Sequence, residues 1–526
     1  MNKLYDTCMR TVLSLLLVIL PILGIADASY LTYEKLAGRT PPCSVGSDCG
    51  AVLNSPYSTI GPIPLSALGL LFYLSVFMVA SLNLLEFDLG NWFKQKKFNR
   101  LRFLQPIDLL VGLSTFGLFF SAFLVLLMGV VIKAWCQYCL LSALISATIW
   151  LTTLIYSQIL DRSPFMAKRV WSSVVGGVYR EFLKPVFFLF DPEFIHDALT
   201  LKGRFLGHFG FTRAMSQTMF GFSHPVLAQT FDGIRFPNPV GLSAGFDYDG
   251  DLTGILPSVG FGFHTIGTVT LQAYDGNQPP RLGRFPKSQA LLVNKGLKSM
   301  GAASLIKKLE TREFAIPVGI SIASTNTLFS NTKEQILDML QCFVLFERSN
   351  VKHAYYELNI SCPNTFGGEP FTSSERLEVL LHCTDALQLS RPLYLKMPID
   401  QNQAETAALL SVADRHRVDG VIFGNLTKDK NNPSVEASDR EHWKTSRGNL
   451  SGKPTWERSN AHIAYTKKTY GNRFTIIGTG GIFSGKDALE KMRLGADLVQ
   501  LITGMIFQGP QLIGQINQDI AEHWQQ

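Results

Sequence analysis

Four long apolar runs in the first 160 residues constrain the fold of this chain more than any other feature. They cover residues 11–26, 63–84, 109–132 and 140–160. Because a helix rises about 1.5 Å per residue, runs near 20 residues match the roughly 30 Å hydrocarbon core of a bilayer. We therefore expect four transmembrane helices. A secretory signal peptide is an alternative for the first run, since a basic segment precedes it, but no convincing small-residue cleavage site follows.

Lysine and arginine cluster beside these runs, and cytoplasmic loops of membrane proteins are enriched in both residues. The clusters comprise Lys3, Arg10, Lys94, Lys96, Lys97, Arg100, Arg102, Arg162, Lys168 and Arg169. With four spans, all of them fall on one side of the membrane, which we take as cytoplasmic. The formal net charge of +7 therefore indicates a membrane surface rather than nucleic acid as the partner. A solvated loop without a partner explains any single cluster equally well.

Two closely spaced cysteine pairs lie in this apolar half, and the predicted orientation puts both on the extracytoplasmic face. Cys43 and Cys49 lie between the first two runs, while Cys136 and Cys139 form the C-x-x-C of AWCQYC, directly before the fourth run. Such a motif holds two sulfurs close enough for a readily exchanged disulfide, and a helix N-terminus lowers the pKa of a thiol. Half of a zinc site, or two merely packed thiols, are the alternatives.

The apolar half resembles the vitamin K epoxide reductase family, in particular bacterial members that oxidise thiol partners and reduce quinone. The resemblance covers residues 8–160 and rests on both cysteine pairs, on Ser55 in SPYS, and on IPLSALGL at the start of the second run. It implies that Cys136 and Cys139 face the quinone, with Ser55 close to it. It also implies that Cys43 and Cys49 pass oxidising equivalents to an exported thioredoxin-like protein.

Residues 161–225 are aromatic and basic. We expect two short amphipathic helices here that place Phe and Leu against lipid and Lys184, Lys202 and Arg204 at the headgroups, as a membrane-facing hood. Packing against the following domain is the alternative. The segment DPEFIHDALTL resembles the N-terminal extension of class 2, quinone-linked dihydroorotate dehydrogenases. That resemblance implies that His196 lies near a quinone tunnel.

Eight short aliphatic or β-branched runs follow residue 225 and alternate with amphipathic stretches. They read PVGLSAG, FHTIGTVT, PVGISIA, YYELNIS, LYLKMPI, GVIFGN, FTIIGTGG and LVQLITG. The segments between them, such as KEQILDMLQCFVLFER, have apolar residues spaced by about 3.6 positions. Eight β-then-α units over about 300 residues predict a (β/α)8 barrel, with its chemistry at the C-terminal ends of the strands.

Polar side chains and glycines gather at the predicted strand ends. Asn359, Lys396 and Asn425 come just past three strands, and Asn294 lies in a loop. Several amides that converge can bind a flat ring of alternating C=O and N–H groups, such as a pyrimidine, although a single Asn is more often a turn or cap residue. The glycines of IIGTGGIFSG and LVQLITGMIFQGP leave bare backbone amides that can hold a phosphate.

From about residue 191 to the C-terminus the chain resembles dihydroorotate dehydrogenases, through FPNPVGLSAGFD, GFHTIGTVT, ELNISCPNTFGG, YLKMP, SGKP, IIGTGGI and DLVQLITG. The resemblance implies an FMN-binding barrel that oxidises (S)-dihydroorotate to orotate and passes the electrons to quinone. Cys362 occupies the position of the general base, where the quinone-linked class normally has serine and the soluble class cysteine. A thiol loses its proton more readily than a hydroxyl, so the exchange is chemically workable. An unreactive buried thiol is the alternative.

The same resemblance assigns the ligand-binding residues. The substrate would be held by Asn294, Asn359, Asn364 and Asn425. FMN would be lined by Ala244, Gly245, Thr268, Asn359, Lys396, Gly452, Gly481, Thr503 and Gly504, with Lys396 at the pyrimidine end of the flavin. Three positions depart from the family pattern: Tyr248 replaces a lysine that binds the substrate carboxylate, Ser321 an asparagine and Ile502 a tyrosine. Lys295 and Lys298 are candidates to supply the lost cation.

We therefore expect a bifunctional oxidoreductase of the inner (cytoplasmic) membrane, with a transmembrane domain over residues 1–160, a hood over 161–225 and a barrel over 226–526. Both sites would discharge electrons into a quinone pool, of ubiquinone or menaquinone, and neither a metal nor nucleic acid is expected. Two alternatives follow from the departures above. The thiol oxidase would carry a barrel that is noncatalytic, or one that acts on another dihydropyrimidine.

Overall fold

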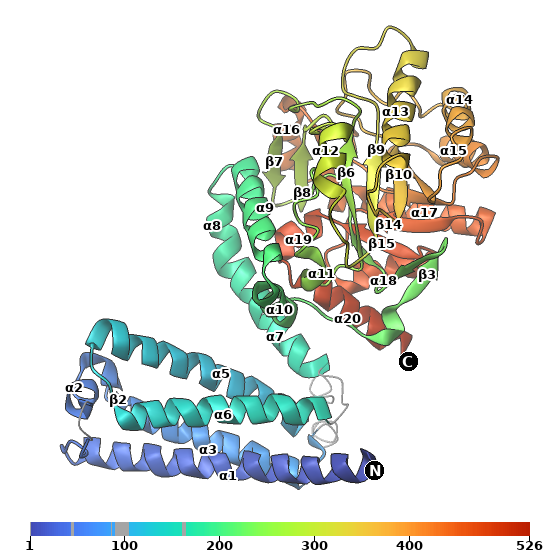
Figure 1. The fold of residues 1–526 in the computed structure, drawn as a ribbon. Coiled ribbons are helices and arrows are strands. Elements are labelled where there is room, and N and C mark those ends of the chain that lie inside the picture. The colour runs from blue at the N-terminus through green and yellow to red at the C-terminus, as the bar shows by residue number, and fades with distance from the viewer. Residues whose placement is uncertain (1, 44–46, 86, 90–104, 160–164, 526) are drawn as a thin grey trace. The chain divides into compact units, whose positions relative to one another are not determined.

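The computed structural model describes residues 2–43, 47–85, 87–89, 105–159 and 165–525 (Figure 1). Within these ranges the chain forms two compact units, Met1–Trp171 and Ser172–Gln526. The boundary falls inside helix α7 (Phe165–Val178), a few residues beyond the last apolar run. Most of the basic clusters that set the predicted orientation, including all of residues 94–102, lie outside the described residues or have no described side chains.

The first unit is a bundle of four long helices, each long and apolar enough to cross a membrane. They are α1 (Asn2–Leu36), α3 (Leu65–Leu84), α5 (Pro106–Leu126) and α6 (Gln137–Ile159), and a π-helical turn (Leu127–Ile132) prolongs α5. The four predicted spans are confirmed. Helix α1, however, continues ten residues past the end of its apolar run, because no Gly or Pro interrupts the chain until Gly38, whose φ of 68° is left-handed.

The apolar side chains of the bundle fall into a buried set and an outward-facing set. Leu17, Val76, Leu110 and Ile149 are buried between the helices, whereas a set of large apolar side chains points outward, as a lipid-facing surface requires. This outward set includes Leu71, Met78, Phe116, Phe119 and Leu144. Tyr73 is fully buried, and its hydroxyl is within 2.8 Å of Ser142 Oγ and 3.0 Å of Ser146 Oγ.

Short elements close one end of the bundle. Between α1 and α3 they are α2 (Cys49–Leu53), a 3₁₀ turn (Pro56–Ser58) and a two-stranded hairpin of β1 (Thr59–Ile60) and β2 (Ile63–Pro64). The N-cap of α2 is Asp48, whose carboxylate accepts from the backbone N–H of Ala51. The segment is thus folded as a compact loop.

The hood contains more helix than expected. Instead of two short helices, the chain forms α7, a π-helical turn (Tyr179–Leu183), α8 (Lys184–Phe188), α9 (Pro192–His208) and α10 (Gly210–Met219), with Lys184 on α8 and Lys202 and Arg204 on α9. Pro185 is tolerated inside this stretch because it follows the π-helical turn, in the first turn of α8, where a missing N–H is harmless. Large apolar side chains of the hood are exposed, including Phe182, Leu189, Phe194, Phe205 and Phe211.

The second unit contains a closed, all-parallel barrel of eight strands, in the order β5-β6-β9-β10-β11-β12-β14-β15 and back to β5. All eight predicted strands are confirmed: β5 (Val240–Leu242), β6 (Phe263–Val269), β9 (Val318–Ile322), β10 (Tyr355–Asn359), β11 (Leu393–Met397), β12 (Gly420–Phe423), β14 (Thr475–Thr479) and β15 (Leu498–Leu501).

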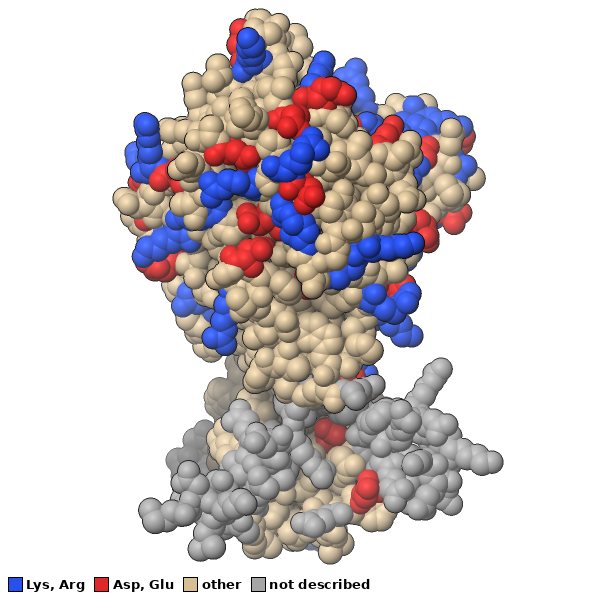
Figure 2. Space-filling view, turned by 90° about the vertical axis from the view of Figure 1, so that its right-hand side faces the viewer, with Lys and Arg blue, Asp and Glu red and all other residues tan. Residues whose placement is uncertain are grey.

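Helices surround the barrel (Figure 1). They are α11 (Leu256–Val259), α12 (Ala302–Leu309), α13 (Thr332–Glu347), α14 (Ser374–Asp385), α15 (Gln403–Asp414), α16 (Ala437–Thr445), α17 (Trp456–Tyr470), α18 (Gly485–Arg493), α19 (Thr503–Gln508) and α20 (Leu512–Trp524). Acidic and basic side chains alternate over the face of this unit that Figure 2 shows, so no single sign dominates there.

Two small antiparallel sheets supplement the barrel, and the sequence patterns did not indicate either. One is the hairpin of β3 (Gln229–Phe231) and β4 (Ile234–Phe236). The other joins β7 (Leu282–Phe285), β8 (Ala290–Val293) and β13 (Asn449–Gly452), in which β13 pairs with β8 from more than 150 residues away. This second sheet lies over the end of the barrel formed by the C-termini of its strands, because β8 and β13 carry residues that line the cavities there.

Aromatic rings fill one end of the barrel interior. Phe236, Phe263, Tyr355 and Tyr394 are fully buried in one cluster. Space for them comes from glycines on the strands: a Cβ at Gly319 would lie only 2.1 Å from the ring of Tyr355.

Replacing Gly319 by Ala should therefore destabilise the barrel by about 1–3 kcal/mol, the usual cost of overpacking a core. Thermal unfolding of the full-length protein in detergent measures the effect. Gly177→Ala is the control, because no described atom outside its chain neighbours and its own helix backbone lies within 4 Å of its added Cβ; as a Gly-to-Ala change within a helix it should not destabilise the protein. Equal unfolding temperatures for both variants would contradict this account of the packing.

Candidate active sites

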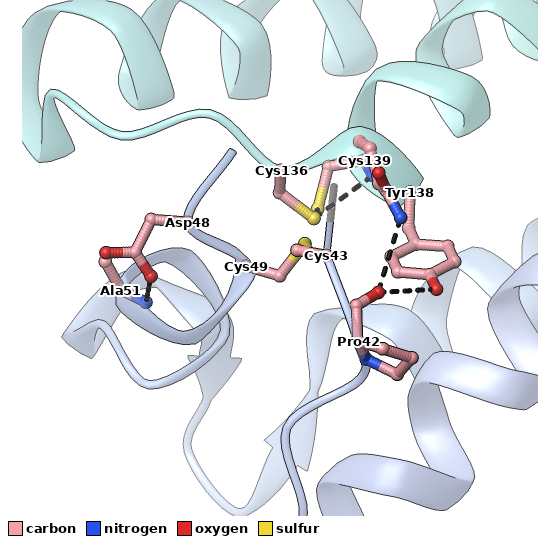
Figure 3. The surroundings of a disulfide bond; sticks show 9 residues. Pro42, Cys43, Asp48, Cys49, Ala51, Cys136, Tyr138 and Cys139 are labelled. Atoms are coloured by element: carbon pink, nitrogen blue, oxygen red, sulfur yellow. Dashed lines mark hydrogen bonds between the residues drawn. A yellow bond between two sulfur atoms is a disulfide. The ribbon is translucent and has the colours of Figure 1, made fainter. Parts of the chain in front are cut away.

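The two cysteine pairs of the bundle lie together at its closed end. Cys43 and Cys49 form a disulfide with a Cα–Cα distance of 6.1 Å. Cys136 and Cys139 are free, with 2.8 Å between their sulfurs. All four belong to one apolar cluster, and Figure 3 shows the two pairs facing each other. Residues that are about 90 positions apart thus form a single sulfur site.

One backbone hydrogen bond and one side-chain hydrogen bond hold the loop and the C-x-x-C turn in place. The N–H of Asp48 donates to the carbonyl of Trp135 at 2.9 Å, and the hydroxyl of Tyr138 donates to the carbonyl of Pro42 at 3.0 Å (Figure 3). Thiol–disulfide exchange requires one sulfur to approach another, and these bonds bring the pairs into that arrangement. Among the described residues, no group of His, Cys, Asp and Glu is arranged as a metal site, so the zinc alternative gains no support there.

A cavity of about 540 Å³ opens inside the bundle next to this site. Cys139 lines it, and so does Ser55, whose hydroxyl donates to the carbonyl of Val52 at 2.8 Å. Its remaining walls are mostly aliphatic and aromatic, with Leu31, Phe72 and Phe120 among them. A flat apolar molecule could thus reach the sulfur of Cys139 from within the bundle.

A second cavity, of about 530 Å³, lies at the C-terminal ends of the barrel strands. The predicted residues that line it are His196, Ala244, Gly245, Thr268, Asn359, Cys362, Asn364, Lys396 and Asn425. Hood helices α8 and α9 supply part of its wall, with Phe188, Ile195 and Leu199. The Nε2 atom of His196 lies 2.9 Å from the carbonyl of Phe246 and attaches α9 to the barrel.

A buried polar network forms the floor of this cavity. The ammonium of Lys396 donates to Glu357 Oε1 at 3.1 Å, and the hydroxyl of Ser321 donates to the same oxygen at 2.9 Å. Asn359 donates to the hydroxyl of Thr268 at 2.9 Å, which in turn lies 3.0 Å from the hydroxyl of Ser321. Ser321, which replaces a family asparagine, is therefore part of a carboxylate-centred network.

Glu357 is the member of this network that the sequence analysis missed. Its side chain is fully buried, and its Oε2 has no hydrogen-bond partner among the described residues. Glu357 precedes Asn359 by two positions on β10, so both side chains point into the barrel, and this spacing was the available signal.

Cys362 is half-buried and faces the cavity from the loop after β10. Burial raises the pKa of its thiol to about 11, and the backbone N–H of Asn364 opposes that shift only in part. The thiol is therefore protonated at neutral pH. It lies within a cavity that also holds the cation of Lys396, which favours the thiolate when it forms.

A smaller, glycine-lined cavity of about 90 Å³ continues from the larger one. The predicted FMN residues Gly452, Gly481, Thr503 and Gly504 line it, and Lys396 lines both cavities. Gly452 and Gly481 have φ values of 91° and 73°, which only glycine adopts readily. A Cβ at Gly481 would approach Trp456 to 2.8 Å. The cavity thus depends on the absence of side chains.

Asn294 is the one predicted site residue of the barrel that does not line either described cavity. Its side-chain oxygen accepts from Asn277 Nδ2 at 3.0 Å, and Asn277 also donates to the carbonyl of Asn364 at 2.9 Å. Asn294 therefore supports the loop that carries Asn364. Direct contact between Asn294 and a ligand stays a prediction.

An ion pair between the hood and the barrel adjoins Tyr248. Lys295 lines the cavity, is only 4% exposed, and pairs with Glu193 in the first turn of α9. Its ammonium lies 5.6 Å from the centre of the Tyr248 ring. Glu193 also accepts from Arg281 at 3.0 Å. Sequence reasoning missed Glu193, although its position three residues before His196 puts both on the same face of the helix.

Comparisons with known proteins agree with this geometry. The model of the family described as Dihydroorotate dehydrogenase matches residues 226–524. A protein named Dihydroorotate dehydrogenase (quinone) from Synechococcus sp. (strain JA-2-3B'a(2-13)) is 33% identical over 363 residues, which are 66% of this chain and 94% of that protein. The chain belongs to the dihydroorotate dehydrogenase family.

Other relatives match the same part of the chain. The protein of the same name from Methylococcus capsulatus is 34% identical over 357 residues and is covered to 99% of its length. The crystal structure of DHODH in complex with ferulenol from Eimeria tenella has a TM-score of 0.56 and 25% identity, and it covers 64% of this chain and 92% of that one. These matches account for the hood and barrel.

The N-terminal unit has a separate match. The model described as Vitamin K epoxide reductase family covers residues 15–154, which include α3, α5, both cysteine pairs and most of α1 and α6. The chain is thus a fusion of a vitamin K epoxide reductase-like bundle with a dihydroorotate dehydrogenase-family barrel. Both predicted resemblances are confirmed.

Proposed function

We propose that this chain is a membrane enzyme with two oxidoreductase sites, each of which delivers electrons to quinone. The barrel oxidises dihydroorotate to orotate, and the bundle oxidises the thiols of an exported thioredoxin-like protein. The observation that carries the first part is the convergence of Cys362, Lys396, Asn359 and Asn425 on one cavity that continues into a glycine-lined cradle. The names of the relatives that match the barrel supply the reaction.

The residues of the barrel fit FMN as the cofactor. The bare backbone of Gly452, Gly481 and Gly504 suits a phosphate, since a Cβ at any of the three would fill the cradle or collide with its wall. Lys396, which lines both cavities, would meet the flavin where they join. When bound, FMN supplies the hydride acceptor and the route of the electrons to quinone.

Cys362 acts as the general base in this reaction. It takes the proton from C5 of dihydroorotate while the amides of Asn359 and Asn425 hold the ring, because these side chains face the same cavity. The proton passes to the sulfur of Cys362, which accepts it in the thiolate form. The hood helices line the apolar side of the cavity, where a quinone approaches from the bilayer.

Anaerobic addition of dihydroorotate should bleach the yellow purified protein. The thiolate of Cys362 is the proton acceptor and burial raises its pKa to about 11, so the bleaching rate should rise up to about tenfold per pH unit between roughly pH 7 and pH 10. Cys362→Ala should bleach at least about 100-fold more slowly. A flat pH profile, or an alanine variant as fast as the wild type, would exclude this role for Cys362.

Lys295 supplies the cation that a lysine supplies in the family pattern at the position of Tyr248. It is buried in the wall of the same cavity, above the ring of Tyr248, and α9 holds it in position through Glu193. The carboxylate of the substrate would then share the ammonium with Glu193. Burial lowers the pKa of Lys295, and the hydrogen bond to Glu193 opposes this, so the ion pair keeps the cation available.

Lys295→Met should weaken the binding of orotate by about 30-fold or more, since removing one partner of a buried charge pair costs at least about 2 kcal/mol. Titration of the flavin absorbance measures it. Lys298→Met is the matched control, because Lys298 is a neighbouring lysine that does not line the described cavity. The double variant Lys295→Met with Glu193→Gln removes the unpaired carboxylate and should bind as weakly. Tight binding by the double variant would refute the assignment.

The bundle takes electrons from thiols on the extracytoplasmic side of the membrane, opposite to the barrel, and passes them to quinone. An exported dithiol reduces the disulfide of Cys43 and Cys49, these exchange with Cys136 and Cys139, and Cys139 faces the cavity in which quinone is reduced. We infer that the cysteines are extracytoplasmic and the barrel cytoplasmic, in the inner membrane, from the arrangement of lysine and arginine along the sequence. One lipid-soluble product, the quinol, then leaves both sites through the bilayer.

The two sites should work independently. Cys139→Ser should abolish quinone reduction by a dithiol, because no disulfide can form with Cys136, while dihydroorotate still bleaches the flavin at the wild-type rate. Cys383→Ser, which changes a free thiol of the barrel unit, should affect neither activity. Simultaneous loss of both activities in Cys139→Ser would show that the sites are coupled.

A second candidate for the barrel is another dihydropyrimidine as substrate, which the replacement of a family lysine by Tyr248 favours. A substrate without a carboxylate needs no cation at that position. Bleaching by dihydrouracil but not by dihydroorotate would select this candidate. A protein that binds no flavin, or flavin that neither compound bleaches, would instead indicate a noncatalytic barrel.

A further inference from the structure

A buried aspartate lines the cavity of the transmembrane bundle. Asp27 lies on α1, is 8% exposed, and shares the cavity wall with Cys139. Its Oδ2 is buried without a hydrogen-bond partner among the described residues. An acidic side chain inside a membrane span is costly, and such residues usually face a functional cavity.

The neighbouring charged and polar side chains of the cavity wall do not account for the burial of Asp27, because they bond to other partners. The other charged residue of the cavity wall, Lys35, donates instead to the carbonyl of Leu53 and to the hydroxyl of Ser58. It is eight residues farther along α1, which is about 12 Å along the helix axis. The buried hydroxyl of Tyr73 is bonded to Ser142 and Ser146 rather than to Asp27. Asp27 therefore forms neither an ion pair with Lys35 nor a hydrogen bond with Tyr73.

The local packing directs this part of α1 toward the cavity. Gly24 lies one turn before Asp27, and the ring of Tyr73 packs directly on it, since a Cβ there would lie 2.4 Å from that ring. Ala28, which follows Asp27, also lines the cavity. Tyr57, Tyr73 and Cys139 complete the titratable groups of the wall, together with Lys35.

Reduction of quinone needs protons as well as electrons. When Cys136 and Cys139 close to a disulfide, one S–S bond forms, two S–H bonds break, and two electrons and two protons move to the quinone oxygens. The electrons pass directly from sulfur. The protons need a carrier, because most of the wall is apolar and offers water few partners.

We propose that Asp27 is a proton-transferring catalytic residue of the bundle, an inference that rests on the proposed reduction of quinone by thiols. The carboxylic acid donates its proton to a quinone oxygen as the electron pair arrives. The carboxylate then receives one proton released by the Cys136–Cys139 pair, passes it to the second quinone oxygen, and receives the other thiol proton. Two protons thus reach the quinone in each turnover, and the carboxyl group ends as it began. The protons and electrons of the dithiol appear together in the quinol.

The test uses the full-length protein in detergent, with dithiothreitol as donor and a short-chain ubiquinone as acceptor. Asp27→Asn keeps the size and polarity of the side chain but cannot transfer a proton, so kcat should fall about 100-fold or more while KM for the quinone changes little. Asp27→Glu should recover much of kcat. A wild-type thermal unfolding profile of the bundle in both variants shows that this unit is folded, and flavin bleaching by dihydroorotate should be unchanged.

An infrared measurement gives a readout that does not depend on turnover. A protonated buried carboxyl group absorbs separately from ionised surface carboxylates. The difference spectrum of the reduced wild type minus reduced Asp27→Asn should contain this band, since the other buried carboxyl groups cancel in it. Wild-type kcat in Asp27→Asn, absence of the band from the difference spectrum, or an equal loss in the Asn and Glu variants with a raised KM would overturn the proposal.

The outcomes separate this inference from the function on which it rests. If the wild-type protein does not reduce quinone with dithiothreitol, the proposed thiol activity fails, and the inference fails with it. If the wild type is active and Asp27→Asn is equally active, only the role of Asp27 is wrong.

Discussion

The pairing of the last barrel strand with the first is the interaction on which the larger unit depends. Strand β15 pairs with β5 through Val499 and Val240, Gln500 and Gly241, and Leu501 and Leu242, and this closes the barrel. Parallel strands in a closed barrel must end at the same rim. Consequently Asn359, Lys396 and Asn425, which come from three different strands, face one cavity.

The bilayer imposes the corresponding constraint on the smaller unit. Helices satisfy their own backbone hydrogen bonds and therefore expose apolar side chains to lipid. Polar groups inside the bundle find side-chain partners or face the cavity: Tyr73 bonds to Ser142 and Ser146, and Asp27 lines the cavity wall. The sulfur site lies at the end of the same cavity. Cys139 thus belongs both to the sulfur site and to the wall of the cavity inside the bundle.

Two of the positions in the barrel that depart from the family pattern lie beside charged side chains. Where the family has lysine and asparagine, this chain has Tyr248 and Ser321. The first adjoins the Lys295–Glu193 pair, and the second bonds to the buried Glu357. In each case a charged group from another element lies beside the changed position. Glu193 belongs to the hood. The position of Lys295 in the cavity wall therefore depends on the docking of α9 as well as on the barrel.

Local patterns were sufficient to predict the four spans and all eight barrel strands, because apolar run length and periodicity follow from the bilayer thickness and from alternating burial. All of the barrel-site residues that the family motifs indicated, except Asn294, also line one of the two described barrel cavities. Only the tertiary structure decided the contacts that join distant residues: the ion pair of Glu193 with Lys295, the pairing of β13 with β8, and the position of Asp27 beside the cavity of Cys139. Such contacts depend on how whole elements pack, and no short stretch of sequence encodes that packing.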